Sequence, residues 1–200
     1  EADKWVFEGN AWYPGTMSDW WNSLSGSLPS LTRPSVPTPP ELVSLVSFPF
    51  WEENHWRNRF PASIKGFSLT TTADEIAESL LESHAFSIRS NLEMLEAVSG
   101  APATRVLVGG GAAEVLSTLL PDVLGRSIDI VESHSESALA GVTLVGRALG
   151  IPTHATPDIR SVMPHQRRNY DAGYGAFIEA YLTEFSAHTR RRTPEKLENP

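Results

Sequence analysis

The chain has 200 residues, 40% of them hydrophobic and 20% charged, which is ordinary for one globular domain with a sizeable core. Its net charge of −8 argues against nucleic acid or an anionic membrane surface as a partner, because both attract a basic face. The absence of cysteine excludes disulfides, thiolate metal sites and cysteine nucleophiles. No apolar run of membrane-spanning length and no basic-then-apolar leader is visible, so we expect a cytoplasmic protein. Glu1 is not a natural start, and we expect the chain to be a piece of a longer protein.

The first 50 residues predict two strands, a short helix and a proline-rich connection. Residues 4–9 are typical of a strand, and residues 16–24 have the composition of a short helix. Residues 25–40 contain five prolines, which cannot sustain a helix or a central strand, so we expect an exposed connection. The apolar run at residues 42–50 predicts a turn of helix followed by a strand.

Charged and aromatic residues are dense from residue 51 to residue 69. The pattern is typical of a substrate-facing loop, or of a surface loop whose Trp51 and Trp56 pack on the core. We favour the surface loop because charged loops are usually solvated.

A long helix is predicted to start after Thr72. Thr72 and Glu75 fit a capping box, in which the Thr hydroxyl accepts from the Glu75 N–H and the Glu carboxylate reaches back. Apolar residues then recur at spacings of three and four over about 25 residues and form one apolar stripe. His84 lies on that stripe, so we interpret it as a hydrogen-bonded core histidine rather than a catalytic one.

Three successive glycines join a predicted strand to a predicted helix. The apolar run Val106–Val108 precedes Gly109, Gly110 and Gly111, and apolar residues at helical spacing continue to Leu124. Glycine lets the backbone adopt a positive φ, and the N–H groups of a first helical turn carry partial positive charge. Phosphate-bearing ligands bind at turns of this kind, although turns that serve only packing share the pattern.

A second strand and helix follow, at residues 127–131 and 135–149. In this helix the small residues Ala138 and Gly141 share one side with Val142, which would let a sheet or a ligand approach. The alternation of strand and helix from residue 104 to residue 149 predicts an α/β architecture with a parallel pair of strands.

The C-terminal part predicts one more helix and a tail. Pro152 and Pro157 are expected to end the regular structure before it. Residues 168–187 place their aromatic side chains on one stripe, which predicts a helix docked on the body of the domain. Residues 188–200 are expected to form a solvated polar tail.

Several functional classes lack a signature in this sequence. We find no Ser/His/Asp set with recognisable spacing and no His/Asp/Glu cluster with metal-ligand spacing. The contiguous glycines do not fit the Gly-Xaa-Gly-Xaa-Xaa-Gly spacing of a dinucleotide site, and no acidic residue ends a second strand to hold a ribose. Composition and periodicity therefore predict an α/β domain with a candidate anion-binding turn.

Five segments indicate a family, because they occur in a characteristic order and at a characteristic spacing. They are VFEGNAWYPGTMSDWW, FPFWEENHWRNRFPASIKGFSL, EIAESLLESHAFSIRSNLEML, VLVGGGAAEVLSTLLPDVLG and ESALAGVTLVGRALG. Together they resemble the C-terminal domain of the FGGY carbohydrate kinases, the family that includes glycerol, xylulose and gluconate kinases. The resemblance assigns residues 1–187 to that domain, with residues 25–40 as a connection inside it and residues 188–200 as the tail.

The resemblance implies an α/β fold of the ribonuclease H-like, actin-like ATPase type, truncated at its N-terminus. It also implies transfer of the γ-phosphate of ATP to a hydroxyl of a sugar or polyol, with Mg²⁺ held mainly through the nucleotide. In the family the catalytic Asp, the phosphate-binding hairpin and the sugar-binding domain precede this part of the chain. We therefore expect no catalytic residue and no metal ligands here, and a nucleoside-binding half that is inactive alone.

The resemblance implies a set of nucleotide-contacting residues in this chain. They are Gly15, Asp19, Gly109, Gly110, Gly111 and Glu114. The Gly15 backbone would line the nucleotide phosphates, and Asp19 stands where a Gln often contacts the nucleotide. The three glycines would approach the adenosine. Glu114 falls at or beside a Ser or Asn that often touches the base or ribose.

Some positions depart from the family pattern and leave two interpretations open. Glu114 would repel a nearby phosphate, Glu78 replaces the usual Arg of the long helix, and Glu53-Asn54-His55 replaces a Gly-Glu-Arg triplet. The first interpretation is the nucleotide-binding half of a divergent carbohydrate kinase. The alternative is a non-catalytic binding or regulatory module on an actin-like scaffold.

The resemblance also predicts an open sheet edge. In the family the strands are ordered 3-2-1-4-5, and the strand near Val6 corresponds to the third, while those near Val106 and Ile130 correspond to the fourth and fifth. Without strands 1 and 2, the fourth strand would expose unpaired backbone groups. We expect the isolated chain to self-associate through this edge or to have a rearranged sheet, unless the missing half supplies the absent strands.

Overall fold

The computed structural model describes residues 14–25, 38–45, 62–110, 113–131, 136–151, 158–165 and 169–192. The strand predicted at residues 4–9, Trp51 and Trp56, and Gly111 lie outside the described residues. The same is true of most of the proline-rich connection, so these predictions stay predictions.

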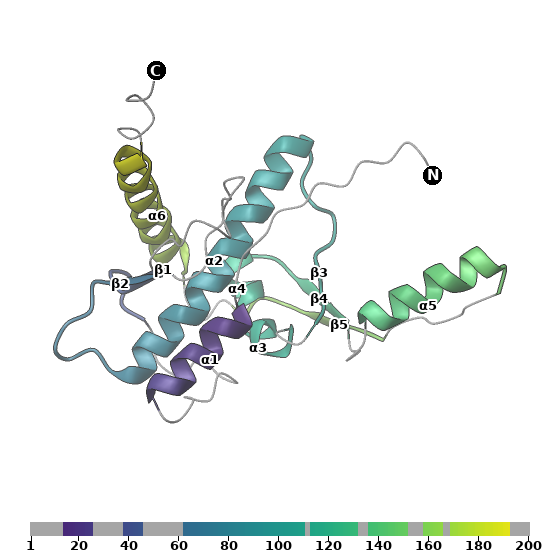
Figure 1. Cartoon of the computed structure of the whole chain (residues 1–200), viewed down its shortest axis with the longest axis horizontal. Helices are drawn as coiled ribbons and strands as arrows, with labels where there is room; N and C mark the ends of the chain where they lie inside the picture. The colour runs from purple at the N-terminus through teal and green to yellow at the C-terminus, as the bar shows by residue number, and fades with distance from the viewer. Residues whose placement is uncertain are drawn as a thin grey trace, which may run out of the picture.

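The described residues form helices and two small sheets (Figure 1). The helices are α1 (Pro14–Ser25), α2 (Ala73–Ser99), α3 (Ala113–Ser117), α4 (Leu120–Leu124), α5 (Glu136–Leu149) and α6 (Asp171–Arg192). The strands are β1 (Val43–Leu45), β2 (Ser63–Lys65), β3 (Leu107–Val108), β4 (Ile128–Val131) and β5 (Ile159–Val162). β1 and β2 pair antiparallel, whereas the second sheet has the order β3-β4-β5. In that sheet β3 and β4 are parallel, as predicted, and β5 is antiparallel to β4.

Helix α2 runs through the middle of the molecule, with α6 and the β1–β2 pair on one side and the β3-β4-β5 sheet on the other (Figure 1). Its predicted capping box is confirmed. The Glu75 N–H donates to Thr72 Oγ1 at 3.2 Å, and the Thr72 N–H donates to Glu75 Oε2 at 2.7 Å. At the other end Gly100 has a φ of 73°, and its N–H donates to the Glu96 carbonyl at 3.0 Å. Local chemistry therefore fixes both ends of the longest helix.

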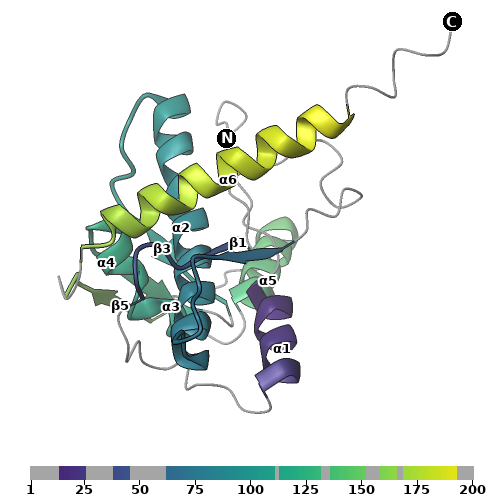
Figure 2. The same ribbon diagram turned by 90° about the vertical axis from the view of Figure 1, so that its left-hand side faces the viewer.

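The core lies where α6 crosses α2 (Figure 2). Phe177 of α6 and Leu45 of β1 are completely buried. The ring of Phe86 on α2 lies 5.7 Å from that of Phe177, and Tyr170 and Tyr181 are also buried. The predicted docking of the aromatic C-terminal helix is confirmed, although the helix continues to Arg192 rather than ending near residue 187.

One predicted helix is divided in two. The apolar pattern after the glycines predicts a continuous helix, but the structure has α3 and α4 with a turn at residues 118–119. Pro121 explains the break, because a proline ring clashes with the carbonyl four residues earlier, here that of Ser117, the last residue of α3. The pattern still marks the core correctly, since Leu116, Leu120 and Val123 are buried.

Two short strands were not predicted. β2 lies inside the stretch interpreted as a surface loop, and β5 lies after Pro152 and Pro157, where regular structure was expected to end until the last helix. Neither strand shows a buried face alternating with an exposed one, since β2 is half-buried throughout and β5 is mostly exposed. The sequence signal is weak in both, because β2 has only three residues and the four residues of β5 do not alternate between apolar and polar.

Helix α5 forms as predicted, but its small-residue side does not pack closely. No described atom comes within 4 Å of a Cβ built on Gly141, and Val142 is 57% exposed. Figure 1 shows α5 extending away from the rest of the molecule. Among the described residues no sheet packs on Gly141 and Val142, so the expectation that a sheet or a ligand approaches this side stays a prediction.

Candidate functional site

The glycine turn connects the end of β3 to the start of α3. Gly109 and Gly110 are exposed, and Gly110 has a φ of 92°, a backbone conformation that favours glycine. The Ala113 N–H donates to the Gly110 carbonyl at 3.0 Å, which holds the turn against the first residue of α3. No described atom comes within 4 Å of a Cβ built on Gly110. Within the described residues, the space beside the Gly110 Cα is therefore open.

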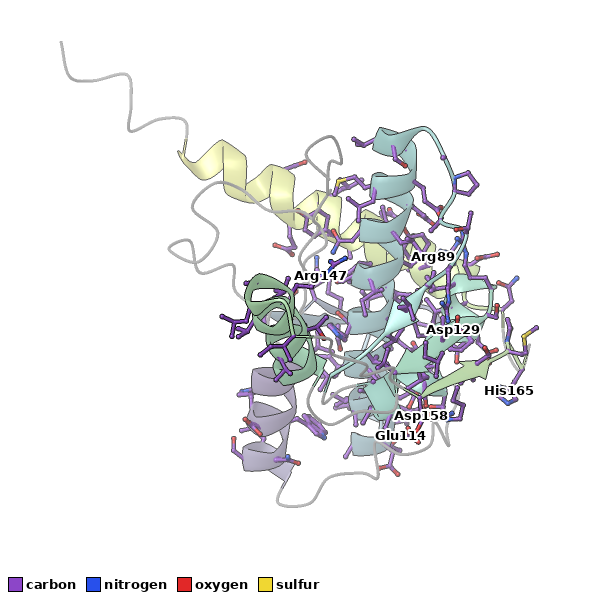
Figure 3. The ribbon with its side chains drawn as sticks, turned by 90° about the vertical axis from the view of Figure 1, so that its right-hand side faces the viewer. Arg89, Glu114, Asp129, Arg147, Asp158 and His165 are labelled. Carbon is purple, nitrogen blue, oxygen red and sulfur yellow. The ribbon has the colours of Figure 1, made fainter. Side chains whose placement is uncertain are left out.

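Glu114 lies in the first turn of α3, and its side chain is 79% exposed. Arg160 of β5 donates from Nη2 to Glu114 Oε2 at 2.9 Å. Figure 3 shows Glu114 and Asp158 at the same end of the small sheet. Arg160 has no signal in the sequence, because β5 carries no alternating pattern and only the pairing of β5 with β4 brings Arg160 to Glu114.

Asp129 of β4 is held by two partners. The Ser161 hydroxyl and the Arg105 guanidinium both donate to its carboxylate, which lowers the pKa of Asp129 below its usual value. Arg105 precedes β3 and Ser161 belongs to β5. Asp129 thus joins all three strands and fixes the sheet that supports the glycine turn.

Gly15 and Asp19 belong to a different part of the structure. Both lie on α1, where Asp19 is exposed and Trp21 is buried against Ala77 and Leu80 of α2. Figure 2 shows α1 lying apart from α3. The described residues therefore do not gather the α1 residues and the glycine turn into one pocket, and the roles of Gly15 and Asp19 stay predictions.

His84 is buried, as the apolar stripe predicts. Burial lowers the pKa of His84 from 6.5 to about 4, because the charged ring would lose its hydration. The ring is therefore neutral near pH 7 and lies inside the molecule at 7% exposure. Glu78, at the position where the family has an Arg, is also buried on α2.

A small recess lies between α2, β1 and α6. Its volume is about 10 Å³, and Ser44, Ser79, Glu82, Ser83 and Phe177 are among the residues that line it. This volume suits one water molecule and is far below that of a ligand pocket. The recess is therefore not a nucleotide site.

The described part of the chain has neither a cluster of metal ligands nor a membrane-spanning helix. Within it, no group of three or more His, Cys, Asp or Glu side chains could hold a metal ion. No helix there is long and apolar enough to cross a membrane.

Residues 3–148 match the sequence model of the C-terminal domain in the FGGY family of carbohydrate kinases. The chain belongs to this family. The family assignment of the sequence analysis is thereby confirmed. β5 and α6, and with them Arg160, lie beyond the matched residues.

Curated relatives of this FGGY chain include glycerol kinases. The glycerol kinase of Trichlorobacter lovleyi is 27% identical over 157 residues, which are 75% of this chain and 32% of that protein. The glycerol kinase of Koribacter versatilis is 27% identical over 124 residues, 61% of this chain and 24% of that protein. The chain thus spans about a quarter to a third of the length of these relatives.

Solved structures support the fold of this FGGY domain. The xylulose kinase of Rhodospirillum rubrum superposes with a TM-score of 0.70 at 20% identity, covering 90% of this chain and 40% of that one. The Plasmodium falciparum glycerol kinase with ADP gives a TM-score of 0.51 at 17% identity, covering 90% of this chain and 34% of that one. The predicted actin-like ATPase fold is confirmed.

Proposed function

We propose that this chain is the nucleotide-binding, C-terminal half of an ATP-dependent carbohydrate kinase that phosphorylates a sugar or polyol. The observation that carries the proposal is the open, exposed turn at Gly109 and Gly110, at the carboxyl end of a parallel strand in a chain of the FGGY family. Ligands of open α/β sheets bind beyond the carboxyl ends of the strands.

In the proposed site, two parts of the chain contact the nucleotide: the glycine turn with the start of α3, and helix α1. The backbone of Gly109, Gly110 and Gly111 would approach the adenosine of ATP or ADP, and Glu114 would lie beside the base or ribose. On α1, the Gly15 backbone would line the nucleotide phosphates, and Asp19 would also contact the nucleotide. Mg²⁺ would be held mainly through the nucleotide phosphates, where it neutralises charge during transfer.

The rest of the reaction is assigned to polypeptide outside this chain. The base that accepts the hydroxyl proton, the phosphate hairpin and the sugar contacts would come from the other half of the kinase. β3 is a terminal strand of the described sheet, and Leu107 on it is 55% exposed. We expect this edge to pair with that half or with a second copy, and the protein to act in the cytoplasm.

Calorimetric titration of the chain with ADP and Mg²⁺ tests the proposal. We expect saturable binding that Gly110→Ala weakens at least tenfold, because a Cβ strains the turn and fills the open space above it. Gly100→Ala is the matched control, since Gly100 also has a positive φ and open space but caps α2. Equal loss in both variants, or no heat at millimolar ADP, contradicts the proposal.

A further inference from the structure

The Glu114–Arg160 pair stands next to the turn proposed to receive an anionic nucleotide. Glu114 lies four residues after Gly110, in the first turn of α3, and its side chain is 79% exposed. A carboxylate in this place disfavours a polyphosphate, because like charges repel through several ångströms of water. The guanidinium of Arg160, at 2.9 Å, makes the pair electrically neutral.

We propose that Arg160 is a positioning residue of the nucleotide site, which holds the Glu114 carboxylate and cancels its charge so that an anionic nucleotide can bind. The inference rests on the proposed function. It assigns a binding role to β5, an element beyond the residues that match the FGGY model.

Stability alone does not account well for this pair. The side chains of Glu114 and Arg160 are 79% and 42% exposed, and exposed ion pairs stabilise a fold very little. The strand that carries Arg160 is anchored independently, by backbone pairing with β4 and by the bond from Ser161 to Asp129. Loss of the Arg160 charge should therefore change the electrostatic potential at the turn without releasing β5.

The charges around the turn make Arg160 important. Asp158 lies two residues before it, at the same end of the sheet as Glu114 (Figure 3). Arg105, another cation of this sheet, is engaged with Asp129. Without Arg160, Glu114 and Asp158 would both present negative charge toward a ligand that is itself an anion.

The test compares four variants by titration with ADP–Mg²⁺ and with adenosine at low salt. We expect Arg160→Ala to weaken ADP binding about fivefold to tenfold, and Glu114→Gln to strengthen it by a smaller factor. The double variant should return ADP affinity toward that of the wild type, and Arg160→Lys should retain most of it. Adenosine carries no phosphate charge, so Arg160→Ala and Arg160→Lys should change its affinity less than twofold. In the two variants that change Glu114, which is proposed to lie beside the base or ribose, the adenosine titration measures that direct contact.

Lys65→Ala is the matched control, because Lys65 of β2 is about as exposed as Arg160 and forms an ion pair with Glu184 of α6, away from the β3-β4-β5 sheet. It should not alter ADP affinity. Wild-type binding with no effect of Arg160→Ala, or an equal effect on adenosine, overturns the inference and leaves the proposed function intact. Absence of ADP binding in the wild type overturns both.

Discussion

The two sides of α2 differ in what holds them together. Toward α6 and β1, apolar side chains are completely buried, as at Leu45 and Phe177. Around α5 and at the β3 edge of the second sheet, large apolar side chains are half exposed or more, as at Leu107, Val142 and Leu144. The middle strand of that sheet differs, because Ile128 and Ile130 of β4 belong to the same buried core as Phe177. In this second region charged pairs such as Glu114–Arg160 cross between elements. We infer that the core shared by α2, α6, β1 and β4 supplies most of the folding free energy, whereas α5 and the β3 edge supply little of it and leave the ligand-binding backbone exposed.

The largest expected effect is the loss of stability when a core side chain is truncated, compared with an exposed side chain of α5. Phe177→Ala should lower the free energy of unfolding by about 3 to 5 kcal/mol, because it leaves a cavity between α2 and α6. Leu144→Ala on α5 removes a side chain that is 66% exposed, and it should change the free energy of unfolding by less than about 0.5 kcal/mol. Urea denaturation measures both. Similar losses in the two variants would mean that α5 is packed as tightly as α6.

An intermediate effect depends on pH. The pKa of His84 is about 4 in the folded chain and 6.5 in the unfolded chain. Between these two pH values the His84 ring is protonated in the unfolded chain and neutral in the folded chain. Its contribution is fully present above pH 6.5 and is lost as the pH falls toward 4, by up to about 3 kcal/mol. Denaturation curves of wild type and His84→Asn between pH 7 and pH 4 should therefore converge. His165→Asn, at an exposed site, serves as the control.

The smallest expected effect is the loss of the hydrogen bond that caps the N-terminus of α2. Thr72→Ala removes the hydroxyl that accepts from the Glu75 N–H and should cost about 1 kcal/mol. Thr183→Ala is the control, because its hydroxyl bonds only to the Glu179 carbonyl within α6, where a helix needs no cap. A loss in Thr183→Ala as large as that in Thr72→Ala would contradict the capping assignment.

Features that depend on residues close together in the sequence are the ones that the sequence predicts. The cap at Thr72 and the aromatic stripe of α6 depend on residues a few positions apart, and both are confirmed. The division of α3 from α4 at Pro121 was also visible locally but was outweighed by the continuous apolar pattern.

The candidate site depends on longer-range pairing. The glycines are evident in the sequence, and their turn forms where the family resemblance places it. Arg160 reaches Glu114 only because β5 turns back along β4, and no local pattern in a four-residue strand indicates that register. The charge balance of the site was therefore not predictable from Glu114 alone.

Hydrogen exchange with mass spectrometry, with and without ADP and Mg²⁺, tests the central claim most directly, because it reports where the nucleotide touches the backbone. The account predicts ADP-dependent protection of amides in residues 107–117, with unchanged exchange in α6. Protection confined to α2 and α6, or exchange at the glycine turn that ADP does not alter under conditions of saturated binding, would contradict it.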